Sequence, residues 1–207
     1  MTTTDAIALR PARTLADLLP PKAGTRAASV VRAVALVLAG AALTAIAAQL
    51  SFKLPWTPVP YTGQTAAVLL VGTTLGLRLG AASMAIYVLA GVIGLPVFSA
   101  GAHGIEQLLG LTGGYLIGFV VAAAIVGRLA EREWDRSVVH AGALMAFGNL
   151  VIYLVGVPIL SIVTGMSAPD AIWNGALVFL PWDAFKIGVA ALALPAVWRL
   201  AGRRHTR

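Results

Sequence analysis

Six long stretches of the chain are almost free of charged side chains, and this pattern constrains the fold more than any other feature. Only the last of them contains charges, Asp183 and Lys186. The stretches are residues 33–52, 54–77, 79–105, 107–127, 137–169 and 171–198. Since a helix needs about 20 residues to cross a hydrocarbon core about 30 Å thick, the pattern predicts an all-α integral membrane protein with six transmembrane helices.

The expected helices follow these stretches, and the second and third are separated only at Arg78 and Leu79. Charged residues make up 11% of the 207 residues, less than half of the roughly 25% found in average soluble domains. So few charges argue against a soluble enzyme and against a disordered protein. We expect the helices at Val30–Leu50, Thr62–Leu77, Leu79–Val97, Leu111–Leu129, Val138–Val163 and Ala171–Arg199.

Basic residues are divided unequally between the two ends of these helices. With the N-terminus in the cytoplasm, thirteen of the fifteen lysines and arginines fall on the cytoplasmic side, Lys53 falls outside, and Lys186 lies in the sixth helix. The positive-inside rule predicts this asymmetry when both termini are cytoplasmic. The net charge of +7 is therefore a topology signal that suits an anionic inner leaflet, and we expect no nucleic-acid partner.

Three segments follow from this topology. They are a cytoplasmic N-terminal tail at 1–29, a six-helix membrane domain at 30–200 and a basic cytoplasmic C-terminal tail at 201–207. The polar approach to the first helix is too long for a secretory signal peptide, whose apolar core begins much sooner. Within the tail, Thr14–Leu19 is expected to form a short amphipathic helix.

Asp183 and Lys186 are the clearest functional candidates, because polar groups are costly in hydrocarbon. They are three residues apart and so lie on one face of the sixth helix. Pro181 precedes them and is expected to disturb the local backbone. A self-neutralising pair that helps the helices pack is the alternative, but apolar residues often serve packing equally well. The pair therefore favours a polar cavity that binds a polar solute.

A second candidate region is rich in glycine and lies between the third and fourth helices. Gly101 and Gly104 flank His103, and Gly113 and Gly114 open the fourth helix. Glycines let the backbone approach a ligand closely, and a helix N-terminus attracts anions. Glycines also pack membrane helices together, so both a binding role and a packing role are open for these four positions.

Other chemistries find little support in the sequence. The chain has no cysteine, and His103 has no accompanying metal-ligand motif, so we expect no metal site. A Walker motif is also lacking, so the chain is not expected to hydrolyse ATP. An intramembrane hydrolase that uses Ser99 and His103 is an alternative of a different class, although no nucleophile elbow or acid partner accompanies Ser99.

The first helix carries small residues in two pairs at helical spacing. These pairs are Ala35 with Ala39 and Ala41 with Ala45. Small residues four positions apart let two membrane helices approach closely, within one chain or between two proteins. The four alanines are therefore candidate residues for a partner interface.

Four motifs, taken together and in order, resemble the BioY family, the biotin-binding S components of energy-coupling-factor (ECF) transporters. The likeness covers about residues 30–200. It departs from the family pattern at Trp182, where a glycine is common, at Leu111, where a proline is common, and at His103, which occupies a variable position. The motifs are VPYTGQT at 59–65, GLPVF at 94–98, TGGYLIGF at 112–119 and LPWDAFK at 180–186.

The resemblance implies a substrate-binding membrane subunit that captures biotin from outside a prokaryotic cell. Such a subunit sits in the plasma membrane and couples to a transmembrane T component and two cytoplasmic ATPase subunits. Some family members occur without a dedicated energising module. ATP is then used only by the partners, and no cofactor is expected. Family S components meet the T component through small residues on the first helix, and Ala41 with Ala45 matches in kind.

The resemblance also assigns roles to individual residues. Asp183 would accept from the ureido N–H of biotin, and Lys186 would donate to the ureido carbonyl or meet the carboxylate. His103 and the loop N–H groups near Gly101 and Gly104 would hold the carboxylate tail. Residues 54–60 form a proline-rich loop that could act as a lid. Aromatic cover for the ring is expected from Tyr115, Phe98 and Trp182.

Three alternatives stay open beside a biotin S component. The first is an S component for another small vitamin, which the order of affinity among vitamins would separate. The second is the hydrolase with Ser99 and His103, in which Ser99→Ala would abolish activity. The third is a helical assembly subunit without a ligand.

Overall fold

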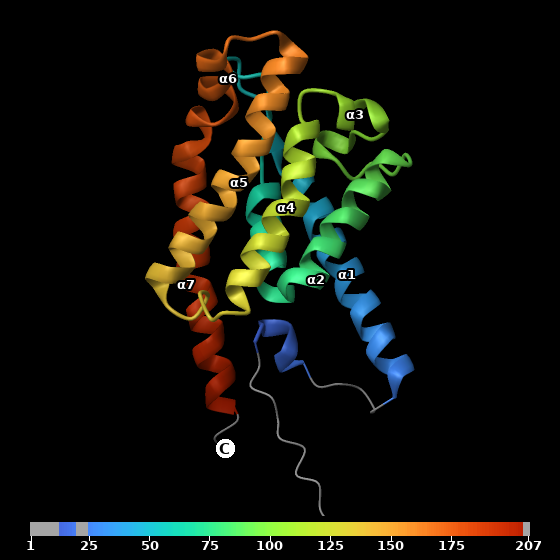
Figure 1. The fold of residues 1–207 in the computed structure, drawn as a ribbon, viewed down its shortest axis with the longest axis vertical. Helices are drawn as coiled ribbons and strands as arrows, with labels where there is room; N and C mark the ends of the chain where they lie inside the picture. Colours follow the sequence, from blue (N-terminus) through green and yellow to red (C-terminus); the bar gives the residue numbers. More distant parts are fainter. Residues whose placement is uncertain (1–12, 20–24, 205–207) are drawn as a thin grey trace, which may run out of the picture.

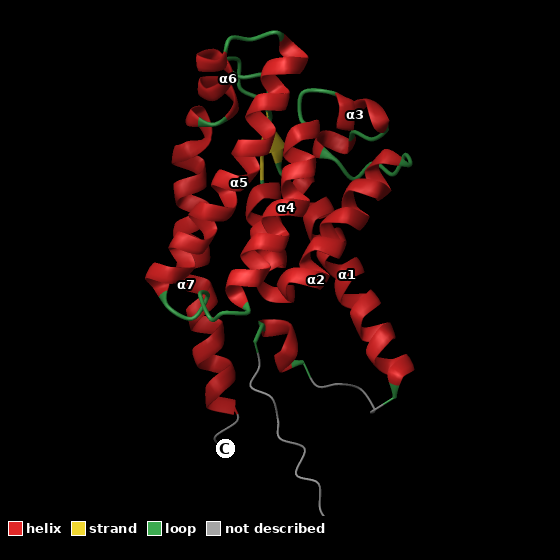
Figure 2. Cartoon of the chain, viewed as in Figure 1, coloured by secondary structure: helices red, strands yellow, loops and turns green. Residues whose placement is uncertain are grey.

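Long apolar helices make up most of the molecule, as the computed structural model shows (Figure 1). The structure describes residues 13–19 and 25–204. Strand is confined there to one short hairpin (Figure 2). The helices are α1 (Arg26–Gln49), α2 (Gln64–Val92), α3 (Ile105–Leu109), α4 (Gly113–Ala130), α5 (Val138–Thr164), α6 (Ala168–Gly175) and α7 (Leu180–Arg204). The hairpin pairs β1 (Ser51–Phe52) with β2 (Tyr61–Thr62), and three 3₁₀ segments are η1 (Leu15–Leu18), η2 (Ser99–Gly101) and η3 (Leu177–Phe179).

Five segments in the described part of the chain are long and apolar enough to cross a membrane. They are α1, α2, α4, α5 and the continuous stretch Ala168–Ala201, which contains α6 and α7. The prediction of an all-α, multi-pass membrane protein agrees with these segments. The count is five rather than six because the second and third expected helices are joined in α2.

The chain reverses direction within α2, at Gly76. This residue has φ of +81° and ψ of 179°, a conformation that is essentially restricted to glycine. Gly72 and Gly80, on either side of the turn, lie so close that a Cβ on Gly80 would be 2.8 Å from the Cα of Gly72. The predicted break at Arg78 is therefore displaced by two residues. Two arms result (teal and green in Figure 1), corresponding to the expected helices Thr62–Leu77 and Leu79–Val97.

The second arm of α2 ends earlier than predicted, at Val92 rather than Val97. Gly94 follows with φ of +110°, and Pro96 lies two residues later. Neither residue continues a helix easily, since glycine there takes a left-handed conformation and proline lacks an N–H donor. The polypeptide between α2 and α3 is consequently an irregular segment that includes η2.

The last expected helix, Ala171–Arg199, is interrupted in the structure. Ala176, with φ of −136° and ψ of −59°, separates α6 from η3, and α7 begins only at Leu180. Pro181 therefore lies in the first turn of α7, where a missing N–H costs nothing. The expected disturbance of the backbone near Pro181 corresponds to this interruption, which ends where α7 begins.

The other boundaries agree with prediction within a few residues, and two of them carry side-chain caps. Thr25 accepts a hydrogen bond from the backbone N–H of Ala28 at the start of α1 (3.2 Å). Ser137 accepts from His140 in the same way at the start of α5 (3.3 Å). Such caps satisfy N–H groups that have no partner in the first turn.

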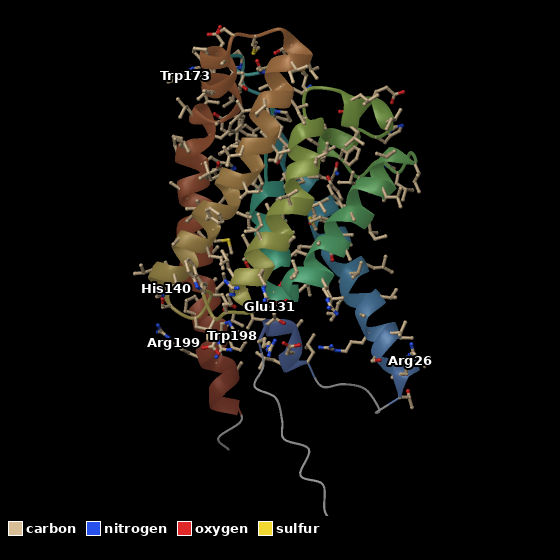
Figure 3. The ribbon with its side chains drawn as sticks, in the orientation of Figure 1. Arg26, Glu131, His140, Trp173, Trp198 and Arg199 are labelled. Carbon is tan, nitrogen blue, oxygen red and sulfur yellow. The ribbon has the colours of Figure 1, made fainter. Side chains whose placement is uncertain are left out.

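One end of the molecule carries Arg26, His140 and Arg199, which Figure 3 labels; we call it the basic end. Here α1 begins and α7 ends (Figure 1). The segment η1 lies against this end, with Thr14 buried as its N-cap and Arg32 of α1 donating to the carbonyl of Ala16. The expected short helix at Thr14–Leu19 is thus present as a 3₁₀ turn. Residues 1–12, 20–24 and 205–207 of the expected tails lie outside the described residues.

Glycine contacts pack α2, α4 and α5 tightly toward the basic end. A Cβ on Gly127 would lie 2.4 Å from the carbonyl carbon of Gly76, and one on Gly148 would lie 2.4 Å from the side chain of Leu69. Only glycine permits such approaches. The core around these contacts is apolar and includes Val68, Val126, Leu144 and Ile152.

Candidate functional site

A cavity of about 480 Å³ lies toward the opposite end of the molecule, a volume typical of small-molecule sites. Its walls come from α2, α4, α5 and α7. Its cover comes from the segment that joins β1 to β2 and from the segment around η2 and α3. Figure 1 shows α3 at this end, away from the start of α1.

Asp183, in the first turn of α7, is the most strongly bound polar side chain of the cavity. It is 3% exposed and accepts hydrogen bonds at Oδ2 from the amide of Asn149 (2.6 Å) and from the hydroxyl of Tyr153. Its Oδ1 lies 2.6 Å from the ammonium of Lys186. Asn149 and Tyr153 are four residues apart and so project from one face of α5. The carboxylate thus connects α5 to α7.

Lys186 lies one helical turn after Asp183 and extends the network to α2. Its ammonium also donates to the hydroxyl of Thr65, at 2.5 Å. The Lys186 side chain is 12% exposed. It lies 5.8 Å from the centre of the Trp182 ring, within range of a cation–π contact. The pair is therefore held by three helices before any ligand is bound.

The hydrogen-bonding capacity of this pair is only partly used. A carboxylate has about four acceptor positions and an ammonium has three donors. Three donors reach Asp183 from Asn149, Tyr153 and Lys186, and two acceptors engage Lys186. By this count one acceptor position on Asp183 and one donor on Lys186 are left, and both residues line the cavity. This arrangement matches a neutral group that presents an N–H next to a C=O.

Aromatic rings supply most of the apolar surface around the pair. Phe98, Tyr115 and Trp182, all expected from the sequence, line the cavity together with Phe119 and Phe179. The hydroxyl of Tyr115 donates to the carbonyl of Gly175 at 2.8 Å and is therefore occupied. These rings can cover an apolar ring system without competing for its polar atoms.

Hydrogen bonds from α1 and α2 fix the segment that carries Phe98. Gln49 donates to the carbonyl of Phe98 and accepts from the N–H of Gly101, both at 3.1 Å. Tyr87 donates to the carbonyl of Val97 (3.1 Å) and accepts from Gln64 (2.7 Å). The cover of the cavity is thereby tied to the helices beneath it.

Half of the residues expected to bind ligand lie outside the cavity lining. His103 is exposed, and its Nδ1 lies 3.2 Å from the carbonyl oxygen of Gly101. Gly101 and Gly104 have φ of +74° and +92° and shape the turn. Their binding roles stay predictions.

Gly113 and Gly114 occupy close contacts between backbones. A Cβ on Gly113 would lie 1.7 Å from the carbonyl oxygen of Leu108, and one on Gly114 would lie 2.7 Å from Ile159. These contacts give both glycines a packing role, which was one of the two interpretations left open. A binding role for them is untested.

Sequence reasoning missed several residues of the site. Asn149 and Tyr153 carry no charge, so a search for charges in apolar stretches passes over them, although their spacing of four residues places them on one helix face. Lys53 and Glu106 also line the cavity. They lie in loops or short helices, where charged residues are ordinary.

The described residues give no geometric support to a hydrolase that uses Ser99 and His103, or to a metal site. In the described part of the chain, the hydrogen bonds of His103 reach Gly101 and none reaches Ser99. No group of three histidine, aspartate or glutamate side chains there could hold a metal ion.

The small residues of α1 fall into two groups. Ala41 is 8% exposed and belongs to the core, and Ala45 packs against that core. Ala35 and Ala39 are exposed. The second pair is therefore used within this chain, and the first pair is available to another protein.

Comparison with known proteins identifies the family. The BioY family model matches residues 19–203. The biotin transporter BioY of Thermotoga maritima is 36% identical over 157 residues, which cover 76% of this chain and 91% of that protein. A probable biotin transporter BioY of Pyrococcus horikoshii is 39% identical over 159 residues, covering 77% and 91%.

A solved structure has the same fold. The S-component for biotin from an ECF-type ABC transporter, a crystal structure, superposes with a TM-score of 0.75 over 86% of this chain and 95% of that one, at 23% identity. At this identity the likeness speaks for the fold alone. Because the family model spans nearly the whole chain and both relatives exceed 30% identity, the chain belongs to the BioY family.

Proposed function

We propose that this chain binds biotin as the S component of an ECF transporter and delivers it for import. One observation carries the proposal: the ion pair of Asp183 and Lys186 lines a cavity of about 480 Å³ and, by count, keeps one acceptor and one donor unused. Biotin's ureido group presents an N–H next to a C=O and so complements this pair. The transporter names of the relatives support the same substrate.

The aromatic lining of the cavity suits the fused rings of biotin. Biotin's fused rings are apolar apart from the ureido group, and Phe98, Tyr115 and Trp182 line the space where those rings would lie. Aromatic faces bury large apolar area with little loss of conformational freedom. A ligand with a charged head group would instead leave one member of the ion pair opposed by a like charge.

The proposed topology places six spans in a prokaryotic plasma membrane, with both termini in the cytoplasm. The two arms of α2 count as separate spans under this proposal. The basic end would face the cytoplasm, in keeping with the positive-inside rule, and the cavity would open to the outside. Lys53 would then be the single basic residue in the outer loops.

Energy would come from partner proteins. The sequence has no Walker motif, so a T component and two ATPase subunits would supply the driving force. We propose the exposed face of α1 around Ala35 and Ala39 as the contact with the T component. Val31, Val34 and Leu38 on this helix are at least half exposed, and small residues beside them would allow close helix packing.

Equilibrium binding of radiolabelled biotin to the purified protein in detergent tests this function. We expect saturable binding at one site that unlabelled biotin displaces and that other water-soluble vitamins displace poorly. Tighter binding of a different vitamin would identify an S component for that compound. Absence of binding, with the protein shown to be folded by its thermal unfolding, would contradict the proposal.

A further inference from the structure

Four charged side chains line the cavity, and two of them differ from the pair already described. Asp183 and Lys186 are joined by their ion pair. Lys53, in the segment that joins β1 to β2, and Glu106, in α3, line the same cavity from its cover. Both are exposed to solvent as well. Because both residues belong to the segments that cover the cavity and both are exposed, we place the mouth of the cavity beside them.

Lys53 is unpaired in the part of the chain that the structure describes. The ion pairs found there join Arg128 to Glu131, Arg136 to Glu133 and Lys186 to Asp183. Glu106, the acidic residue at the mouth, is directed elsewhere: a Cβ on Gly104 would meet its Oε2 at 2.3 Å. The ammonium of Lys53 is therefore available to an anion that enters the cavity.

We propose that Lys53 is the counter-ion of the ligand's carboxylate. This inference rests on the proposed function and deepens it, because it assigns the second polar group of the ligand. The cavity would then recognise a neutral N–H and C=O at Asp183 and Lys186, and an anionic tail at its mouth. Lys186 is committed to Asp183 and Thr65, which leaves Lys53 as the free cation of the lining among the described residues.

The expected competitor for this role is His103, and its geometry is less favourable. Its imidazole is exposed, lies near the carbonyl oxygen of Gly101 and is not part of the cavity lining. Lys53 is therefore the better partner for a carboxylate.

Biotin and biotinamide, in which a neutral amide replaces the tail carboxylate, separate the tail contact from the head-group contact. The affinity of each is measured for the unaltered protein and for Lys53→Gln. We expect the unaltered protein to prefer biotin by about twofold to fivefold, the range of an exposed ion pair. Lys53→Gln should lose most of this preference by weakening biotin alone, and Lys53→Arg should keep it.

Charge variants elsewhere make the result specific. Arg26→Gln removes one positive charge at the basic end and should keep the preference, which excludes an effect of net charge. Glu106→Gln removes a negative charge at the mouth and should increase the preference for biotin over biotinamide. High salt should reduce the preference of the unaltered protein, since exposed charges are screened.

The outcomes distinguish this inference from the function on which it rests. An unchanged preference in Lys53→Gln, with tight biotin binding, would overturn the role of Lys53 and leave biotin binding intact. Loss of the preference in His103→Gln, but not in Lys53→Gln, would transfer the role to His103 and also overturn the inference. If the unaltered protein bound neither compound, the proposed function and this inference would fall together.

Discussion

Two aspartates are buried among the residues that the structure describes, and their surroundings differ sharply. Asp183 is 3% exposed, accepts from three donors that include a cation, and lines the cavity. Asp135 is fully buried in the loop between α4 and α5 and accepts from Trp198 at 2.6 Å. Its Oδ1 has no hydrogen-bond partner within the described residues. Trp198 lies at the basic end in Figure 3.

The difference teaches that burial of a charge does not by itself mark a binding site. Asp183 is held in place by α5 and lines the cavity. Asp135 joins the α4–α5 loop to α7, and the guanidinium of Arg136 lies over the same Trp198 ring, 4.4 Å from its centre. We therefore expect Asp183 to govern ligand binding and Asp135 to affect stability only.

The largest expected effect comes from breaking the ion pair. Asp183→Asn and Lys186→Ala should each weaken biotin binding by well over tenfold, because the remaining partner becomes an unpaired buried charge at a cost of about 3–5 kcal/mol. Equilibrium dialysis with radiolabelled biotin measures the loss. Thermal unfolding of each variant in detergent controls for misfolding. Near-normal affinity in either folded variant would count heavily against the site.

A smaller effect is expected from the side chains that hold Asp183. Tyr153→Phe and Asn149→Ala each remove one donor to Oδ2, and a hydrogen bond to a charged group contributes about 1.5–3 kcal/mol. We expect each to reduce biotin affinity roughly tenfold, measured by isothermal titration calorimetry.

Asn149 is the more informative of the two positions because, unlike Tyr153, it does not line the cavity of about 480 Å³ and so cannot contact a ligand there. A loss of affinity in Asn149→Ala must therefore act through the position of Asp183. Asn149→Gln, which keeps an amide donor on a longer side chain, should recover part of the affinity. Wild-type affinity in Asn149→Ala would show that the carboxylate needs no support from α5.

Hydropathy predicted most of the fold because membrane spans are long apolar stretches. It could not locate the turns within those stretches. The reversal at Gly76 depends on a backbone conformation and on close contact with α4, which no hydropathy pattern records. The break at Ala176 follows Asn174 and Gly175, but a glycine is common inside membrane helices, so hydropathy alone predicts one continuous helix at Ala171–Arg199.

The sequence alone predicts those site residues that are charged and lie in an apolar stretch. Asp183 and Lys186 are charges in an apolar stretch, and desolvation makes such charges rare without a reason. Asn149 and Tyr153 are uncharged, and their partner lies 34 and 30 residues away. The burial of Asp135 depends on Trp198, 63 residues later. Pairings of this kind arise only when distant helices pack, so a single sequence does not reveal them.

The smallest effect, and the one that separates the two aspartates most directly, concerns pH. Burial raises the pKa of Asp135 above its ordinary value of 3.8, so the folded protein holds this proton more tightly than the unfolded chain. The contribution of Asp135 to stability is therefore complete below pH 3.8 and declines as pH rises through the interval up to the folded pKa. Asn cannot ionise, and its carbonyl can still accept from Trp198.

Asp135→Asn should consequently be as stable as the unaltered protein or more so near pH 7, by on the order of 1 kcal/mol. Its advantage should shrink as pH falls toward about 4, the ordinary range of an aspartate. Thermal unfolding in detergent across that range measures the difference, and biotin affinity at pH 7 should be unchanged. A variant that lost affinity as Asp183→Asn does, or whose stability followed the unaltered protein at every pH, would remove the distinction between the two carboxylates.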